Sequence, residues 1–323
     1  MPDHYIRMLD SPLTVQTLRP LGAKVEVVQF CSRLTDKEHQ QAARLLQKRP
    51  DVTLRAFGRP AGVVDVDFLR HYPFVKRVAI DLYNLNSLEG VSHLPDSLQS
   101  FSLGQTKTKR ISLSFLERFQ KLEELSLEGH SKDIEVVSQL KALRQLHFRS
   151  ITLPDLSLLK PLKHLRAFTL KLGGTTELDA LSFLKELRYF EAWMVKGLSD
   201  LSVLAKLKSL THLYLQALAQ VTALPSFRPL RCLKWVTIET LKNLHDLTPV
   251  AEAPKLAELS LIDMRQLPTS ALKPFVGHKS LHAANIGLGS LRRNEEALAL
   301  LEVRGEPTDK FAAYKEAVAG TMK

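Results

Sequence analysis

Hydrophobic and polar positions alternate in a short phrase that recurs along the chain. It reads L-R-Y-F-E-A-W at 187–193, L-T-H-L-Y-L-Q at 210–216 and L-K-W-V-T-I-E at 233–239. The first, fourth and sixth places of each copy are apolar, and successive copies begin 23 residues apart. A fixed period of this length predicts a solenoid, in which stacked units bury their apolar stripes against one another.

The same phrase extends over most of the chain. The steps between successive copies are 21 to 25 residues, and the copies begin at Val75, Leu98, Leu122, Leu143, Leu165, Leu187, Leu210, Leu233, Leu256 and Leu281. An earlier copy begins at Val25, and a degenerate copy at Val52 carries Arg55 in an apolar place. Alternation of this kind predicts one short strand per copy.

The second half of each copy places leucines three residues apart. Three such sets are Leu156, Leu159 and Leu162, then Leu178, Leu181 and Leu184, then Leu201, Leu204 and Leu207. A spacing of three is typical of a 3₁₀ turn or short helix. Asp155, Asp179 and Asp200 stand beside the turn starts and can supply capping oxygens. Each unit is therefore expected to be one strand followed by one helical turn.

Other segments flank the repeats. The first 21 residues predict an irregular lead-in, and Thr35 with Glu38 predicts a capping box for a helix that ends before Pro50. Residues 292–303 and 308–319 predict polar helices that cover the exposed edge of the last repeat. We therefore expect one continuous solenoid: an N-terminal cap with one or two degenerate repeats (1–74), about ten repeats (75–291) and a helical C-terminal cap (292–323).

The phrase L-x-x-L-x-L with its variable second half resembles the leucine-rich repeat family, and the 22 to 24 residue step is similar to that of its bacterial, internalin-type members. The resemblance covers 75–291 and implies an α/β horseshoe, with a parallel sheet on the concave face and short helical turns on the convex face. The ninth place departs from the family. Members usually carry Asn or Cys there, in a hydrogen-bonded ladder, whereas this chain has Ile151, Val195, Leu218, Leu241 and Met264. Backbone groups at that bend must then find other partners.

If places four and six point into the core, places three, five and seven point to the concave face. That face gathers both tryptophans of the chain, and Tyr189, Trp193, Tyr214 and Trp235 are expected within about 10 to 12 Å of one another. Large aromatic rings beside polar groups are typical of interaction hot spots. The predicted partner-binding residues are His147, Arg149, Tyr189, Glu191, Trp193, His212, Tyr214, Gln216, Trp235, Thr237 and Glu239. The alternative is that the aromatic rings only pack on their neighbours across the sheet.

Composition narrows the class of protein. An apolar fraction of 45% is typical of a globular chain, and two cysteines, Cys31 and Cys232, exclude a disulfide framework. The amino terminus does not have the pattern of a secretory signal, and no run of apolar residues is long enough to span a membrane. A cytoplasmic location is expected, with secretion as an effector left open.

The net charge of +11 comes partly from a basic rim, one or two residues per unit just before or at the strand starts. The rim comprises Lys160, Lys163, Lys185, Arg188, Lys206, Lys208, Lys234, Lys255 and Lys279. Such a stripe can track phosphates, although a solvated edge is the commoner use. Acidic residues at the concave centre, Glu191, Glu239, Glu258 and Asp263, oppose a nucleic acid there.

Catalytic and metal-binding patterns are weak. Glu191 and Glu239 are expected about 11 Å apart, which is wide for a pair of glycosidase carboxylates. His147 and His212 are separated by three strands, about 14 Å, and His278 and His282 straddle a strand start instead of sharing a helix face. Neither cysteine has a histidine obviously paired with it. We expect no cofactor and no bound metal.

These patterns favour a noncatalytic, monomeric module that binds a protein partner on its concave face through the aromatic cluster. The alternative is binding of nucleic acid or another anionic surface by the basic rim. An enzyme is the third possibility and would depend on Glu191, His212 and Glu239. Within the first class, the resemblance to bacterial proteins allows a host-directed effector, a toxin-neutralising protein or a scaffold.

Overall fold

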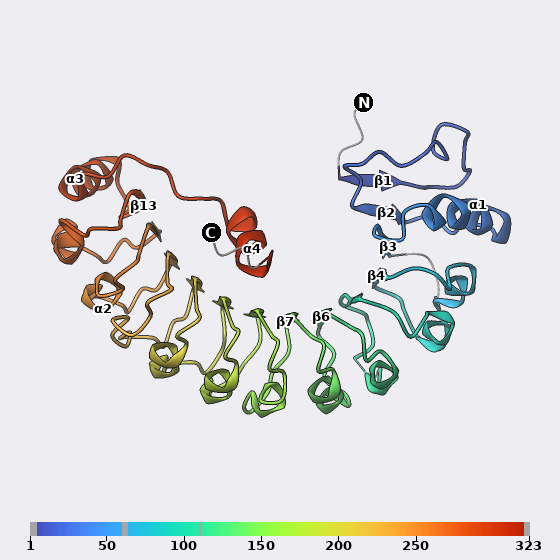
Figure 1. Cartoon of the computed structure of the whole chain (residues 1–323), viewed down its shortest axis with the longest axis horizontal. Helices are drawn as coiled ribbons and strands as arrows, with labels where there is room; N and C mark the ends of the chain where they lie inside the picture. Colours follow the sequence, from blue (N-terminus) through green and yellow to red (C-terminus); the bar gives the residue numbers. More distant parts are fainter. Residues whose placement is uncertain (1–4, 60–63, 110, 320–323) are drawn as a thin grey trace. The chain divides into compact units, whose positions relative to one another are not determined.

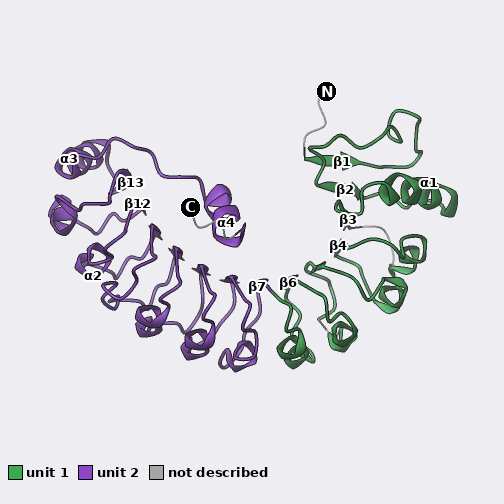
Figure 2. Cartoon of the chain, viewed as in Figure 1, with its two compact units in different colours: residues 1–143 green, residues 144–323 purple. Residues whose placement is uncertain are grey.

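A computed structural model describes residues 5–59, 64–109 and 111–319, and the chain divides into two compact units, residues 1–143 and 144–323 (Figure 2). The first four residues of the expected lead-in lie outside the described residues. The prediction of one continuous solenoid stays a prediction.

Unit 1 pairs six parallel strands in chain order: β1 (Ile6–Met8), β2 (Val27–Phe30), β3 (Thr53–Gly58), β4 (Arg77–Leu82), β5 (Ser100–Leu103) and β6 (Glu124–Glu128). Between them lie α1 (Asp36–Gln47) and four 3₁₀ turns, η1 (Asp67–His71), η2 (Glu89–His93), η3 (Ser114–Arg118) and η4 (Ile134–Gln139). The Thr35 hydroxyl accepts a hydrogen bond from the Glu38 amide, and the Glu38 carboxylate accepts one from the Thr35 amide. The capping box and the end of α1 before Pro50 are confirmed.

Unit 2 repeats the arrangement with seven strands: β7 (Gln145–Arg149), β8 (Ala167–Lys171), β9 (Tyr189–Trp193), β10 (His212–Gln216), β11 (Trp235–Glu239), β12 (Glu258–Ile262) and β13 (Ala283–Ile286). Its helical elements are η5 (Ser157–Leu159), η6 (Asp179–Phe183), η7 (Ser202–Lys206), α2 (Thr248–Ala251), η8 (Thr269–Phe275), α3 (Leu291–Leu301) and α4 (Lys310–Ala319) (Figure 1). Strands line one face of the unit and the helical turns line the other. We call the face of β7–β13 that carries places three, five and seven the concave face of unit 2.

The leucines hold the stack together as the spacing predicts. Each of the ten copies from Val75 onward begins its strand at the third place of the phrase. All nine leucines of the three-residue sets are at least 97% buried. The Asp155 and Asp200 carboxylates accept hydrogen bonds from the Ser157 and Ser202 amides at 2.6 and 2.7 Å, as expected of capping oxygens, whereas Asp179 lies within its turn.

Two predictions near the amino terminus are wrong. The lead-in contains β1, which pairs in parallel with β2, so it is not irregular throughout. The degenerate copy is displaced by one residue, because Leu54 and Ala56 pair with Val78 and Ile80 and are buried. Arg55 therefore does not occupy an apolar place. Arg55 belongs to the side chains on the other face of β3, and its Nε donates to Asp81 at 2.5 Å.

In unit 2, backbone groups at the bend that follows a strand find hydrogen-bond partners although the Asn ladder is missing. The residue at place eight adopts a left-handed conformation with φ of 50° to 55° at Ser150, Leu172, Met194, Ala217, Thr240 and Asp263. From Ser150 to Thr240, its amide donates to the carbonyl of place seven in the next repeat, at 2.7 to 2.9 Å. The apolar residues of place nine are then free to enter the core, and all five are buried.

The left-handed bend predicts that Ala217→Gly stabilises the protein. A side chain at φ 51° costs about 1 kcal/mol relative to glycine, and the greater freedom of glycine in the unfolded chain offsets part of the gain. We expect a net increase of about 0.5 kcal/mol in the free energy of unfolding, measured in urea. The matched control is Ala192→Gly within β9, which should destabilise. Equal losses for both variants would contradict the assignment of strain to the bend.

The two C-terminal helices take different positions. α3 follows β13 and packs at the end of unit 2 against η8, as expected of a cap on the last repeat. The segment after it crosses back, and α4 lies over β9 and β10 on the concave face (Figure 1). The second helix was expected at the exposed edge of the last repeat and does not lie there.

Candidate binding site

Strands β9, β10 and β11 bring a row of rings onto the concave face of unit 2. The parallel register sets Tyr189 beside His212 and His212 beside Trp235, all at place three. The ring centroids of successive members lie 6.5 and 5.9 Å apart. At place five, Tyr214 stacks on Trp235 at 6.2 Å. The sequence prediction that these aromatic residues gather on one face is therefore met by the geometry.

Helix α4 covers this row. Ala313 packs in a buried cluster with Tyr214 and Trp235, and Ala317 packs in a second cluster with Ala167 and Tyr189. The Tyr314 ring meets Tyr189 edge to face at 4.9 Å. As a result Tyr189 is 0% and Trp235 4% exposed. The predicted binding surface is thus occupied by a segment of the same chain.

A buried carboxylate forms the polar centre beneath α4. Glu191 is 1% exposed, and its side chain pairs with the ammonium groups of Lys310 from α4 and of Lys171 from β8, the latter at 3.2 Å. The Tyr189 hydroxyl donates to the same carboxylate at 3.1 Å. A buried carboxylate is costly without a cation, and the ammonium groups of Lys310 and Lys171 compensate the charge of Glu191.

Lys310 is held by a ring as well as by charge. Its ammonium lies 3.6 Å from the centroid of the Tyr214 ring, in a cation–π arrangement. Burial lowers the pKa of Lys310, although the hydrogen bond and charge of Glu191 act in the opposite direction. Burial likewise raises the pKa of the Tyr189 and Tyr214 hydroxyls, with the neighbouring carboxylates adding to the effect. Both phenols therefore act as neutral donors.

Polar contacts hold the residues just before α4 and the middle of the helix. Just before the helix, the Thr308 amide and hydroxyl donate to the Glu258 carboxylate at 2.5 and 2.9 Å, and the Trp235 indole donates to the Thr308 carbonyl at 3.2 Å. Further along, the Tyr314 hydroxyl donates to Gln145 Oε1 at 2.6 Å and lies 2.9 Å from His147 Nε2. The contacts reach from β12 to β7, across six strands of unit 2.

Place seven forms a more accessible margin of the same face. Trp193 is half-buried, with the Arg149 guanidinium 5.5 Å from its ring. Gln216 donates to Glu239 at 2.8 Å, and the Tyr214 hydroxyl donates to the same carboxylate. The remaining predicted residue, Thr237, is buried between these groups on β11. All eleven predicted residues therefore share one face, and their role in binding a partner stays a prediction.

His212 is buried in the aromatic row and neutral. Burial, with a smaller contribution from Lys234, lowers its pKa from 6.5 to about 4. Its Nδ1 lies 2.8 Å from the Thr211 hydroxyl. Because the unfolded chain takes up a proton near pH 6.5 and the folded chain does not until about pH 4, stability is lost as the pH falls between these values.

We therefore expect the free energy of unfolding to fall from pH 7 to pH 5 by about 1 to 2 kcal/mol more in the wild type than in His212→Gln. Comparing the two proteins removes the contributions of all other titrating groups. Parallel pH profiles would show that His212 is not kept neutral by the fold.

The rim residues lie outside the concave face. Eight of the nine are exposed and Arg188 is half-buried. Binding of nucleic acid by this rim stays a prediction, whose signature is a steep loss of affinity with added salt.

The groups that an enzyme would need are engaged in structural contacts. Glu191 is paired with two ammonium groups, Glu239 accepts two hydrogen bonds, and His212 is buried. Among the described residues no group of three or more potential ligands could hold a metal ion. None of the helices in the described part of the chain has the length and apolar character needed to cross a bilayer.

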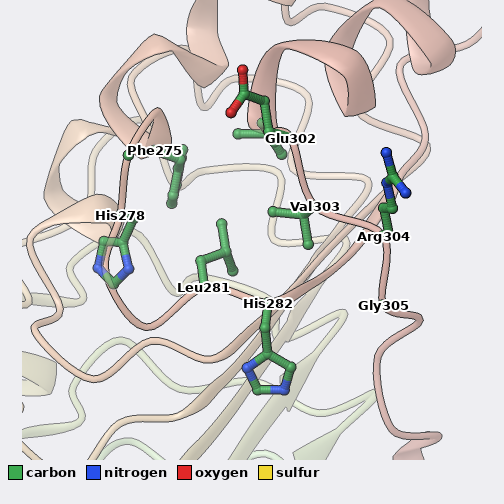
Figure 3. Close-up of a pocket in the computed structure, with 10 residues that line it drawn as sticks. Phe275, His278, Leu281, His282, Glu302, Val303, Arg304 and Gly305 are labelled. Carbon is green, nitrogen blue, oxygen red and sulfur yellow. The ribbon is translucent and has the colours of Figure 1, made fainter.

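A separate pocket of about 480 Å³ lies between the last repeat and the segment that follows α3 (Figure 3). His278 and His282 line it together with Arg304, but both imidazoles lie within hydrogen-bond distance of backbone carbonyls, those of Ala253 and Ser280. His278 and His282 both lie between η8, which ends at Phe275, and β13, which begins at Ala283, so the two do not share a helix.

The sequence reasoning missed the contribution of α4. The residues it failed to name are Thr308, Lys310, Ala313, Tyr314 and Ala317. The sequence carries little signal for this contact, because Lys310, Ala313, Tyr314 and Ala317 share one helix face without forming an apolar stripe, and the large apolar side chain of Phe311 lies on the other side. Nothing local indicates which surface this helix face covers.

Comparisons with known proteins place the fold in a recognised class. No family model matches the sequence, and no curated protein matches it. An internalin from Listeria monocytogenes superposes with a TM-score of 0.51 at 16% identity, over 86% of this chain and 90% of that one. The TLR13–ssRNA13 complex gives 0.50 at 17% identity, over 91% of this chain and 53% of the receptor chain. A leucine-rich repeat protein from Leptospira interrogans gives 0.39 at 17% identity, over 94% and 96%.

The chain has the leucine-rich repeat fold, in which parallel strands alternate with 3₁₀ turns. Within that class it is structurally similar to the internalins, as the length of its repeat predicts. At these identities the likeness concerns the fold alone.

Proposed function

We propose that the protein is a noncatalytic binding module that captures a protein partner on the concave face of unit 2. The leucine-rich repeat fold is typically a binding module, and the rings of Tyr189, Trp193, Tyr214 and Trp235 supply the large, rigid contact area that protein interfaces favour. Roles as a host-directed effector, a toxin-neutralising protein or a scaffold all use such a surface.

One observation carries the proposal: this face already has a protein segment seated on it. Docking of α4 fills two apolar clusters, pairs a buried carboxylate and provides hydrogen-bond partners for side chains on β12 and β7. A face that holds a peptide segment through apolar, charged and hydrogen-bonded contacts has the properties of a protein-binding site.

The proposal is tested by affinity capture from lysates of the source cells, with full-length proteins. The bait is Ala313→Glu, which places a carboxylate in the cluster of Tyr214 and Trp235 and releases α4. A second bait adds Trp193→Ala at the accessible margin, where loss of a hot-spot ring costs about 2 kcal/mol or more of binding. We expect a partner on the first bait that is lost from the second. Identical sets of captured proteins on both baits would overturn the proposal.

A further inference from the structure

Helix α4 presents one face to the repeats, and the chemistry of that face is specific. Its contacts come from Lys310, Ala313, Tyr314 and Ala317, with Val318 packed beside them. These positions share one side of a helix. The opposite side carries Phe311, which is 61% exposed, and the exposed Lys315, Glu316 and Ala319.

The concave face offers a separate receptor for each of these groups. Glu191 and the Tyr214 ring receive a cation. The spaces beside Trp235 and beside Tyr189 each receive a side chain no larger than alanine, and Gln145 with His147 receives a phenol. The concave face therefore recognises four groups of one helix: a cation at position i, small residues at i+3 and i+7, and a tyrosine at i+4.

From this complementarity we infer that the partner's binding segment is a short helix with the same pattern, and that α4 is the chain's own competitor for the site. The inference rests on the proposed function and adds to it the kind of partner and its regulation. Helices with spaced anchors commonly bind grooves in this way. The partner gains access only when α4 leaves.

The contacts of α4 are of a kind that a partner can replace. Only two of its side chains, Ala313 and Ala317, are fully buried, and each contributes little apolar area. A pocket of about 520 Å³ remains beside the helix, lined in part by His212, Trp235 and Glu316. The helix therefore does not fill its site to the density of a protein core.

The covalent connection between α4 and the repeats raises the fraction of time that α4 occupies the concave face. A short flexible connection gives an attached segment an effective concentration on the order of 1 mM. If the free helix binds with a Kd of about 10 µM, α4 occupies the site about 99% of the time, and an external helix binds the wild type about 100-fold more weakly than it binds a chain with α4 released. This ratio is the measurable signature of intramolecular competition.

The test uses a fluorescein-labelled synthetic peptide of residues 306–319 and full-length proteins, with anisotropy as the readout. We expect the peptide to bind Ala313→Glu about 100-fold more tightly than it binds the wild type. Ala319→Glu is the matched control, because it introduces the same side chain on the exposed face of the same helix, and it should behave as the wild type does.

Peptide variants test the pattern. Lys310→Ala and Tyr314→Ala in the peptide should each weaken binding to Ala313→Glu at least tenfold, whereas Lys315→Ala on the opposite face should not. Absence of peptide binding to an Ala313→Glu chain whose circular dichroism shows folded repeats would overturn the inference, and so would equal affinities for the Lys310→Ala and Lys315→Ala peptides. A wild type that sediments as a dimer exchanging α4 between copies would also overturn it.

The two proposals fail separately. A captured protein that depends on Trp193, together with a peptide that does not bind, leaves the proposed function standing without the helix pattern. A peptide that binds as described, with no protein captured, leaves a helix-binding face without the proposed partner.

Discussion

Ala313→Glu should release Trp235 into water. In the wild type this ring is 4% exposed and its indole donates to the Thr308 carbonyl. Glutamate at position 313 cannot fit between Tyr214 and Trp235, and its charge would lie near Glu191 and Glu239, so docking of α4 becomes unfavourable. In a Trp193→Phe background, where Trp235 is the single tryptophan, we expect a red-shifted emission and a several-fold increase in quenching by acrylamide.

The control for this experiment is Ala319→Glu in the same background, which keeps the emission of the parent. Far-ultraviolet circular dichroism should change by no more than the contribution of one short helix, because the repeats stack without α4. If Trp235 is as protected in Ala313→Glu as in Ala319→Glu, then α4 does not cover the ring in the way described.

Among the substitutions proposed, Phe168→Ala should cause the largest decrease in the free energy of unfolding. The ring is fully buried, stacks on Phe190 at 6.1 Å and meets Phe148 edge to face at 5.9 Å, so it joins three successive repeats. Removing a buried phenylalanine costs about 3 to 5 kcal/mol, because apolar surface is lost and a cavity remains. In a stack where each repeat contacts only its neighbours, such a loss weakens two interfaces at once.

The matched comparison is Trp193→Ala, which removes a larger ring from the concave face. That ring is half-buried beside Arg149, and its loss should cost less than about 1 kcal/mol of stability. Urea unfolding of the two variants separates residues that hold the stack from residues that serve the surface. Similar losses for both would contradict that separation.

The repeats could be predicted because their contacts are local and periodic. A leucine at place four or six meets its counterparts about 23 residues away, and the same pattern is written ten times, so that one degenerate copy hardly changes the alignment. Prediction was wrong for two segments in which the pattern does not recur regularly. Arg55 was misplaced by one residue, and the three-residue strand β1 was missed because it is too short to show a period.

The position of α4 could not be predicted for the opposite reason. Lys310 and Glu191 are 119 residues apart, and Tyr314 and Gln145 are 169 apart, with no repeat to show that they meet. The pattern of 310–317 predicts a helix, but it has no continuous apolar side that would favour the concave face over an exposed repeat edge. The position of α4 on the concave face depends on the buried Glu191 carboxylate. Among the strands only Lys171 supplies it with a cation, and Lys310 of α4 supplies a second one.

The claim that α4 and a protein partner share the concave face of unit 2 is tested most directly by competition. The partner captured on immobilised Ala313→Glu is challenged with the peptide of residues 306–319, and the protein released is measured against peptide concentration. Release by this peptide, and none by its Lys310→Ala variant at the same concentration, is the predicted result. A partner that stays bound at saturating peptide would contradict the claim.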